Sequence, residues 1–239
     1  MTWMAPVGLA ACVVGALYHV ATRTRSTDLL DAVDRMPIDS ARLRQLRDRA
    51  GSIPGWLKPT AAERLYKLAR IAPLGSAIEL GSWQGRSTPW IAAGVMDRCE
   101  HEGRGQTYAV DTWRGSDGEA VHRQSIDQMG GPSALFDAFR ANMFRAGVAD
   151  VVVPVRTTTL KAARDPRIPQ CGLLYIDADH SLEGVHADYH AWLPRVVPGG
   201  FVVFDDVPSW TGPTSVARGI AERDLEFVGE IDNHWIGRR

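Results

Sequence analysis

The chain has 239 residues, of which 45% are hydrophobic, and its formal net charge is −1. This length and composition suit one large α/β domain with its own core plus an appendage. The near-zero net charge gives no support for binding to nucleic acid. The three cysteines are scattered and form no CxxC pair, so we expect no disulfide framework and predict a cytoplasmic location.

The N-terminal fifty residues differ in character from the rest. The segment from Trp3 to Val20 is mostly apolar, and its length is near the lower limit for a membrane-spanning helix. A membrane anchor and a helix packed on the domain or on a second subunit both remain open. Residues 26–50 predict a charged amphipathic helix with a break at Met36-Pro37. We expect residues 1–50 to be a helical extension that supports a homo-oligomer, and residues 51–239 to be the main domain.

The main domain begins with a glycine- and proline-containing loop at residues 51–55, followed by a predicted helix from Pro59. Thr60 is a candidate cap for this helix, with Glu63 three residues later as in a capping box. The helix is expected to end at the Pro73–Gly75 segment.

A glycine turn follows the predicted strand Ala77–Leu80, and a helix is expected to begin around Ser87. Such a turn lets a ligand approach the backbone closely. Gly81 and Gly85 lie four residues apart, so the GxGxxG fingerprint of nicotinamide dinucleotides is absent. Glu79, beside the turn, would repel a pyrophosphate but would suit the cationic end of a ligand.

The second predicted strand, Thr107–Val110, ends in an acid, Asp111. An acid at such a strand end can accept the two hydroxyls of a ribose. Taken alone, the glycine turn is also consistent with a plain turn, and Asp111 with an ordinary cap or loop acid.

Residues 113–131 are polar, rich in glycine and without steady periodicity. A loop of this length inside a compact domain is usually functional or disordered. We predict a lid or substrate loop whose contacts are Trp113, His122 and Arg123, with a solvated surface loop as the alternative. A helix from Pro132 to Ala146 and a third strand, Val151–Val155, follow.

Two further apolar runs, Leu173–Ile176 and Phe201–Phe204, flank a helical pattern that is expected to stop at Pro198-Gly199-Gly200. A strand, helix and strand joined by short connections form a βαβ unit, which makes the two strands parallel. Parallel strands share one carboxyl edge, where open α/β sheets bind ligands.

Acids follow both strands of this unit: Asp177 and Asp179 after the first, Asp205 and Asp206 after the second. Carboxylates gathered at one edge need a cation or a proton to hold them together. Hard divalent metals prefer such oxygen ligands. The pattern therefore favours a metal site in an enzyme, and strand-end acids without a metal are the structural alternative.

The motifs ELGSWQGRST, AVDTW and YIDADHSLEGVHADYHAWLPRVVPGGFVVFDD, with the GWLKPTAAERLYKLA segment before them, resemble a class I S-adenosylmethionine-dependent methyltransferase. Within that superfamily they are similar to the branch with macrocin-type and other antibiotic-sugar O-methyltransferases and the cephalosporin-hydroxylase-like proteins. The resemblance spans about residues 55–204. It implies a Rossmann-like, seven-stranded, mostly parallel sheet with helices on both faces. Residues 225–231 and 234–237 would supply the last strand pair, one of them antiparallel.

The resemblance also implies roles for individual residues. Asp177, Asp205 and Asp206 would hold Mg²⁺ or another divalent cation. Asp111 would bind the ribose, and Thr158 would lie at the adenine edge. The full set expected to contact S-adenosyl-L-methionine is Glu79, Gly81, Ser82, Gly85, Ser87, Asp111, Thr158 and Asp177.

The predicted function is metal-dependent transfer of a methyl group to a hydroxyl of a sugar or glycoside. The metal would act as a Lewis acid on the acceptor hydroxyl, and a base would receive its proton. His180 is the favoured base and Asp179 the alternative, while Trp210 is expected to form a wall of the acceptor site. A metal-independent methyltransferase and a non-catalytic protein of the same fold are the rival interpretations.

Overall fold

The computed structural model describes residues 26–73, 75–98, 105–115 and 120–239. The apolar segment from Trp3 to Val20, for which a membrane anchor and a packed helix were both expected, lies outside these ranges. Among the described helices, none has the length and apolar character needed to cross a membrane.

A single seven-stranded sheet forms the centre of the protein, with the strand order β3-β2-β1-β4-β5-β7-β6. The first five strands in this order are parallel, whereas β7 runs antiparallel to both of its neighbours. This arrangement confirms the predicted Rossmann-like fold, including the final hairpin. The strands are β1 Ala77–Leu80, β2 Thr107–Asp111, β3 Val152–Arg156, β4 Cys171–Ile176, β5 Val196–Phe204, β6 Glu226–Ile231 and β7 His234–Arg238.

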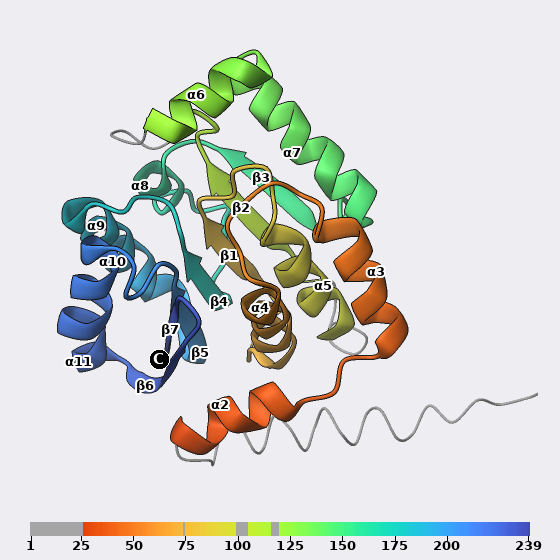
Figure 1. Ribbon diagram of the computed structural model, residues 1–239. Helices are drawn as coiled ribbons and strands as arrows, with labels where there is room; N and C mark the ends of the chain where they lie inside the picture. The colour runs from red at the N-terminus through yellow and green to blue at the C-terminus, as the bar shows by residue number, and fades with distance from the viewer. Residues whose placement is uncertain (1–25, 74, 99–104, 116–119) are drawn as a thin grey trace, which may run out of the picture.

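Helices cover both faces of the sheet (Figure 1). Successive side chains of a strand point to opposite faces of the sheet, so each buried strand contributes to an apolar core on both faces. In β4, Leu173 and Tyr175 belong to one core, and Leu174 and Ile176 belong to the other. The helices are α2 Ser26–Arg35, α3 Ser40–Ala50, α4 Pro59–Ile71, α5 Thr88–Arg98, α6 Ala120–Met129, α7 Pro132–Ala146, α8 Thr159–Ala162, α9 Leu182–Trp192, α10 Thr211–Val216 and α11 Glu222–Asp224.

The described part of the N-terminal extension is packed on the main domain. Leu29 of α2 and Leu46 of α3 are each only 1% exposed and join the same core as α4 and α5. Arg64 of α4 pairs with Asp34 of α2 at 2.9 Å. The break predicted at Met36-Pro37 separates α2 from α3. These helices therefore contribute to the core of the domain that they precede.

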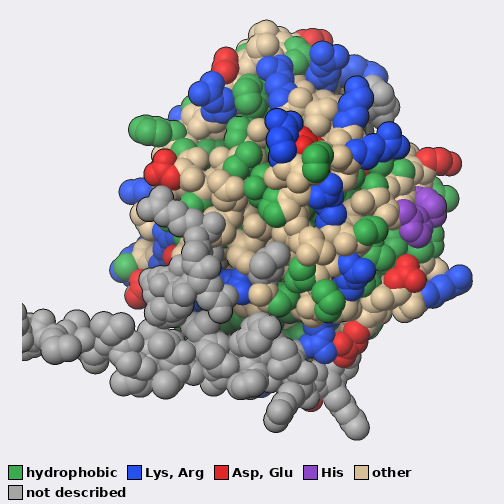
Figure 2. Space-filling view, turned by 180° about the vertical axis from the view of Figure 1, so that it is seen from behind, with side chains coloured by type: hydrophobic (Ala, Val, Ile, Leu, Met, Phe, Trp, Pro, Cys, Tyr) green, Lys and Arg blue, Asp and Glu red, His purple; other side chains and the backbone are tan. Residues whose placement is uncertain are grey.

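The back face of the molecule carries many basic side chains (Figure 2). On this face Lys and Arg are spread over the upper half and alternate with apolar side chains, while acids are fewer there.

Two local predictions were wrong. The first helix of the main domain has Lys58 at its N-cap and Pro59 at its first turn, and Thr60 makes no capping bond. Its hydroxyl instead donates to Asp232, 2.9 Å away, because Pro59 already supplies the helical φ and leaves no N–H to cap there.

The expected stop at Pro198-Gly199-Gly200 was also wrong, because these residues lie within β5. The preceding helix, α9, ends at Trp192, and the strand β5 already begins at Val196. Gly199 adopts a φ of +79°, and the pairing of β5 with β4 shifts register near Cys171. The breaker residues are accommodated as an irregularity in the strand.

Candidate functional site

A cavity of about 970 Å³ opens at the carboxyl edge of the parallel strands. This volume is at the upper end of the range for ligand sites in proteins. Its walls come from the segments after β1, β2, β3, β4 and β5, from the loop before α4 and from α6. Predicted site residues that line it are Gly81, Ser82, Ser87, Asp111, His122, Thr158, Asp177, Asp179, His180, Asp205, Asp206 and Trp210.

Four predicted contacts do not line this cavity: Glu79, Gly85, Trp113 and Arg123. Trp113 is fully buried in the core beneath α7, and its ring packs against Phe139 at 4.9 Å. Its indole is apolar enough to be drawn into the core although the surrounding sequence is polar. Arg123 is exposed on α6. The segment predicted as a loop thus contains a ten-residue helix, and of its three expected contacts only His122 reaches the cavity.

Glu79 organises the glycine turn from inside the protein. Its carboxylate is fully buried and accepts hydrogen bonds from the hydroxyls of Ser82, Ser87 and Thr88 at 2.5–2.7 Å. Burial raises the pKa of the Glu79 carboxyl, and the three hydroxyl bonds oppose that rise. Glu79 thus shapes the turn from inside the protein, and its expected contact with the cofactor stays a prediction.

The two glycines of the turn serve different neighbours, although both have a φ of +84°. A Cβ on Gly81 would lie 2.0 Å from the carbonyl oxygen of Asp177, so glycine lets the ends of β1 and β4 approach each other. A Cβ on Gly85 would lie 2.3 Å from Met143 of α7. Gly85 therefore closes the contact with α7, and only Gly81 faces the cavity.

Asp111 fixes the turn from the neighbouring strand. Its Oδ2 accepts the backbone N–H groups of Ser82 and Trp83 at 2.9 and 2.8 Å. Its Oδ1 accepts the N–H of Trp113 at 2.6 Å. The same carboxylate lines the cavity, so it is oriented by three backbone donors while facing the ligand space.

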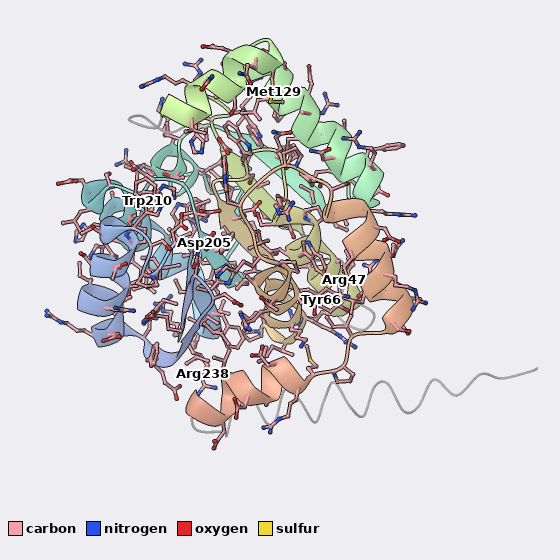
Figure 3. All side chains as sticks on the ribbon, viewed as in Figure 1. Arg47, Tyr66, Met129, Asp205, Trp210 and Arg238 are labelled. Atoms are coloured by element: carbon pink, nitrogen blue, oxygen red, sulfur yellow. The ribbon has the colours of Figure 1, made fainter. Side chains whose placement is uncertain are left out.

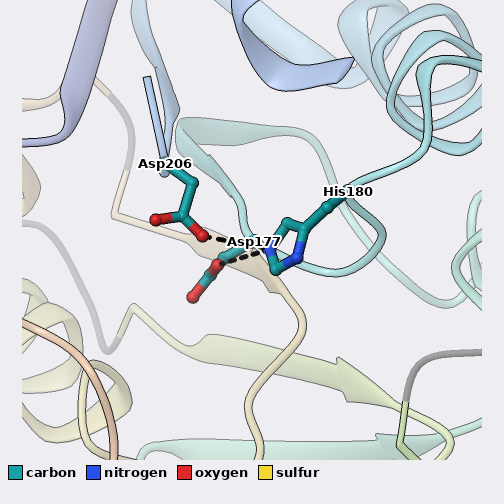
Figure 4. A group of neighbouring side chains, drawn as sticks. All are labelled: Asp177, His180 and Asp206. Atoms are coloured by element: carbon teal, nitrogen blue, oxygen red, sulfur yellow. Dashed lines mark ion pairs between the residues drawn. The ribbon is translucent and has the colours of Figure 1, made fainter. Parts of the chain in front are cut away.

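Asp177, His180 and Asp206 form a cluster at the ends of β4 and β5 (Figure 4). His180 Nε2 lies 3.2 Å from Asp206 Oδ2 and 3.9 Å from Asp177 Oδ1. One ligand atom of each residue lies within 4.8 Å of the others, close enough for a shared metal ion.

The electrostatics of this cluster fit a cation. Burial, followed by the charge of Asp205, raises the pKa of Asp177 well above its usual range, while His180 opposes the rise. A divalent ion between the carboxylates would replace that repulsion with attraction. Two carboxylates and an imidazole suit transition metals such as Mn²⁺, and Mg²⁺ would need water to complete its shell.

Asp205, predicted as a metal ligand, is not in the three-residue group (Figure 3 shows it at the end of β5). Its Oδ2 accepts the Tyr175 hydroxyl at 2.7 Å, and its Oδ1 lies 3.3 Å from His234 Nε2. Burial raises the pKa of Asp205, but His234, Tyr175 and the Asp206 amide outweigh it and lower that pKa. Asp205 is thereby drawn toward the sheet, and His180 takes its place in the group.

His234 lies fully buried beside Asp205. The contact follows from the strand pairing, because β7 pairs antiparallel with β5 so that Trp235 is opposite Phe204. The residues just before and just after this pair therefore meet. This register depends on contacts far apart in sequence, so the acid motif alone could not reveal it.

Asp179, the alternative base, points toward the start of α9. Its Oδ1 accepts the N–H of Ser181 at 2.8 Å, and a Cβ on Gly184 would lie 2.2 Å from its Oδ2. His180 instead stacks on Trp210, with ring centroids 4.7 Å apart and planes 27° apart. The stacked histidine is thus the better oriented of the two candidates.

Sequence patterns missed two aromatic residues of the cavity, Trp56 and Trp83. The Trp83 ring stacks on His122 at 4.7 Å, and Trp56 lies 5.5 Å from the same imidazole. Trp83 lies in the glycine turn and Trp56 in the loop before α4, but neither residue has a spacing in the sequence that indicates a ligand contact.

The fold and the site together define a class I S-adenosylmethionine-dependent methyltransferase. The sequence profile of a family described as a methyltransferase domain matches residues 78–207, more than half of the chain. The protein belongs to this family, which confirms the enzyme class that the motifs predict. A search of curated protein sequences gives no match.

Several solved structures share this fold. Cofactor-bound Rv0187 from MTB has a TM-score of 0.57 and 18% identity, covering 90% of this chain and 98% of its own. The O-methyltransferase NovP has a TM-score of 0.57 and 16% identity, covering 96% and 99%. The calicheamicin methyltransferase CalS11 has a TM-score of 0.55 and 19% identity, covering 99% and 95%. At these identities the likeness concerns the fold.

Proposed function

We propose that this protein is a divalent-metal-dependent O-methyltransferase that acts on a hydroxyl of a sugar or glycoside. The observation that carries the proposal is the cluster of Asp177, His180 and Asp206 in the same cavity as Gly81 and Asp111. Methyl-donor and acceptor sites must adjoin in a methyltransferase, and this cavity places a metal-compatible group beside the turn expected to hold the donor.

The cavity suits the donor through its charge. Asp111, Asp177 and Asp188 are among the carboxylates that line it, and S-adenosylmethionine carries a sulfonium and an amine. Asp111, already oriented by three N–H groups, has the position expected for a ribose contact. The cofactor supplies the activated methyl group, and the protein supplies orientation and electrostatics.

Asp177 and Asp206 are the carboxylates that would hold the metal. Asp205 supports Asp206, because its Oδ1 accepts the backbone N–H of Asp206. A divalent cation bound there would act as a Lewis acid that makes an acceptor hydroxyl easier to deprotonate.

His180 is the base in this proposal. Its Nε2 would receive the hydroxyl proton, and the nearby Asp206 carboxylate would stabilise the resulting imidazolium. The stacked Trp210 ring holds the imidazole plane. An alternative role, in which His180 is the third metal ligand, is separable because it predicts loss of metal affinity as well as activity.

The sugar acceptor draws support from the neighbours. CalS11 is also described as a TDP-rhamnose 3'-O-methyltransferase, in a structure with a TM-score of 0.51 and 19% identity, covering 100% of this chain and 96% of its own. An antibiotic sugar or a mannoside of a methylated polysaccharide would fit the proposed chemistry. Trp210, which is 44% exposed at the cavity, would supply a flat face for a sugar ring.

The decisive experiment measures methyl transfer from S-adenosylmethionine to a panel of glycosides, with product mass as the readout. We expect a mass gain of about 14 daltons, because the cofactor fixes the transferred group. EDTA should abolish the reaction and excess Mg²⁺ or Mn²⁺ should restore it. Activity that survives EDTA would favour the metal-independent alternative, and calorimetry without any S-adenosylmethionine binding would favour a non-catalytic protein.

A further inference from the structure

Three aromatic side chains in the cavity have no task in the proposed reaction. Trp56, Trp83 and His122 come from the loop before α4, from the turn after β1 and from α6. The Trp83 and His122 rings are stacked at 4.7 Å with planes 29° apart. Trp56 is tilted by 45° to both, at 5.5 Å from His122 and 6.3 Å from Trp83. Three distant segments thus bring their rings to one place.

The backbone of Trp83 is held in a conformation that side chains of its size rarely adopt. Its φ is +48°, in the left-handed region. The N–H of Trp83 donates to Asp111 at 2.8 Å, and its carbonyl accepts the indole N–H of Trp113, also at 2.8 Å. Strain of this kind persists only where the surroundings enforce it, and it concentrates at ligand sites. The backbone that carries the Trp83 ring is therefore fixed before any ligand arrives.

Trp56 is held differently, since its backbone is anchored while its ring stays in solvent. Arg86 donates to the carbonyls of Ile53 and Leu57 at 2.6 and 3.1 Å, on either side of Trp56. The Trp56 side chain nevertheless remains 69% exposed at the cavity. A large apolar ring on a fixed loop would gain from burial against a ligand.

The ligand group that contacts the three aromatic rings can be inferred from the parts of the cavity that are already assigned. In the proposed function the adenine lies near Thr158, the ribose near Asp111 and the acceptor hydroxyl near Asp177. The aromatic cluster adjoins the ribose position, because the N–H of Trp83 donates to Asp111, but its three rings are not among the groups assigned to the adenine, the ribose or the acceptor hydroxyl. His122 belongs to the segment predicted to contact the acceptor, and the Trp56 ring lies 5.5 Å from the His122 ring.

We propose that Trp56, Trp83 and His122 form an acceptor subsite that stacks a flat aromatic ring attached to the methylated sugar. This inference rests on the proposed function and extends it, because it makes the substrate an aryl glycoside or a similarly substituted sugar. The planar faces of the three rings favour stacking, and no charge on the ligand is required.

The test compares p-nitrophenyl α-L-rhamnopyranoside with methyl α-L-rhamnopyranoside, by calorimetry on the full chain saturated with S-adenosylhomocysteine and Mg²⁺. We expect the aryl glycoside to bind about 2- to 12-fold more tightly, the range typical of an aromatic pair. Trp56→Ala should bring the ratio close to one, and Trp56→Phe should restore most of it. Phe144→Ala is the matched control, since Phe144 is 78% exposed on α7 and outside the cavity lining.

Equal affinity of the wild type for the two glycosides, including undetectable binding of both, would overturn the subsite. An unchanged ratio in Trp56→Ala would also overturn it. Weaker binding of S-adenosylhomocysteine by Trp56→Ala would assign the aromatic cluster to the cofactor instead. Failure of the proposed function is recognised separately, because the wild type would then bind no S-adenosylhomocysteine.

Discussion

The imidazole of His180 is constrained at its nitrogen and at its face. Nε2 lies 3.2 Å from Asp206, and Trp210 covers the ring. Gly212 lets the start of α10 pack on the same segment, because a Cβ there would lie 2.2 Å from the His180 carbonyl oxygen. Asp179 has no comparable support from the acid cluster, since it binds the start of α9. The two candidate bases should therefore respond differently to substitution.

His180→Ala should lower kcat by about 10²- to 10⁴-fold, the usual contribution of a general base. The affinity for S-adenosylmethionine should be unchanged, because the expected donor contacts lie around Gly81 and Asp111. Asp179→Asn keeps the acceptor oxygen for Ser181 and should retain kcat within about threefold of the wild type. Steady-state kinetics and calorimetry check these values. Full activity in His180→Ala would transfer the role to another group.

Glu79 offers a second test at the residue scale. Glu79→Ala would leave the hydroxyls of Ser82, Ser87 and Thr88 without their buried acceptor. We expect a loss of about 2–4 kcal/mol in the free energy of unfolding, together with weaker binding of S-adenosylmethionine through the loosened turn. Urea denaturation and calorimetry measure the two effects. If stability were retained while binding of the donor was lost, Glu79 would be a direct contact after all.

Sequence reasoning succeeded where chemistry is local and failed where it depends on packing. Asp177 and Asp206 could be placed at one edge because Asp177 directly follows β4 and Asp206 is the second residue after β5. The exchange of Asp205 for His180 could not be foreseen, because it depends on Tyr175 and His234 reaching Asp205 from other parts of the sheet. The prediction that Trp113 contacts the substrate was wrong for a related reason, because the burial of Trp113 beneath α7 depends on tertiary contacts.

At the scale of elements, α6 shows why a helix that lines a cavity can resemble a loop in the sequence. Of its described side chains, Ile126 is buried and most others face solvent or the cavity, so no apolar period is visible. The regular core helix α7 could be predicted from residue 132 to residue 146, and it ends at Gly147 in the left-handed conformation.

The contact between α8 and α9 contains a buried acid that should make stability depend on pH. Asp188 is 3% exposed and accepts the Thr159 hydroxyl, and burial raises its pKa from 3.8 to about 6. The pKa of Asp188 is higher in the folded protein than in the unfolded chain. The contribution of Asp188 to the free energy of unfolding is therefore complete below about pH 4. It is lost as pH rises through about 6.

Asp188→Asn keeps a hydrogen-bond acceptor and removes the titration. Relative to this variant, the wild type should lose about 2–3 kcal/mol between pH 4 and pH 7, the energy of a pKa shift of about two units. Urea denaturation at intervals across this range gives both curves. Parallel curves for the two proteins would show that Asp188 titrates normally in the folded state.

At the scale of the whole molecule, the question is whether the N-terminal extension is a separate attachment. The sequence suggests a boundary near residue 50, where a glycine- and proline-containing loop begins. In the structure, Leu29 and Leu46 lie in the same apolar core as Tyr175 of β4. Arg86, from the turn region, donates to the carbonyls of Gly51 and Ile53 and ties this loop to the cavity wall.

Leu46→Ala tests this coupling. Leu46 is 1% exposed, and truncation of such a side chain typically costs about 2–5 kcal/mol. If α3 is part of one cooperative unit, the substitution should lower the Tm of a single thermal transition followed by circular dichroism. Arg47→Ala is the control on the same helix: its pair with Glu63 is solvent-exposed, so its loss should cost at most about 1 kcal/mol.

The two structural alternatives differ in the shape of the transition. A loosely attached extension would melt at low temperature by itself, and Leu46→Ala would leave the main transition where it is. A shared core requires both segments to unfold together, so the change in α3 should also weaken binding of S-adenosylmethionine near the melting temperature. That link arises because α3, the Arg86-held loop and Trp56 follow one another on the path from the core to the cavity.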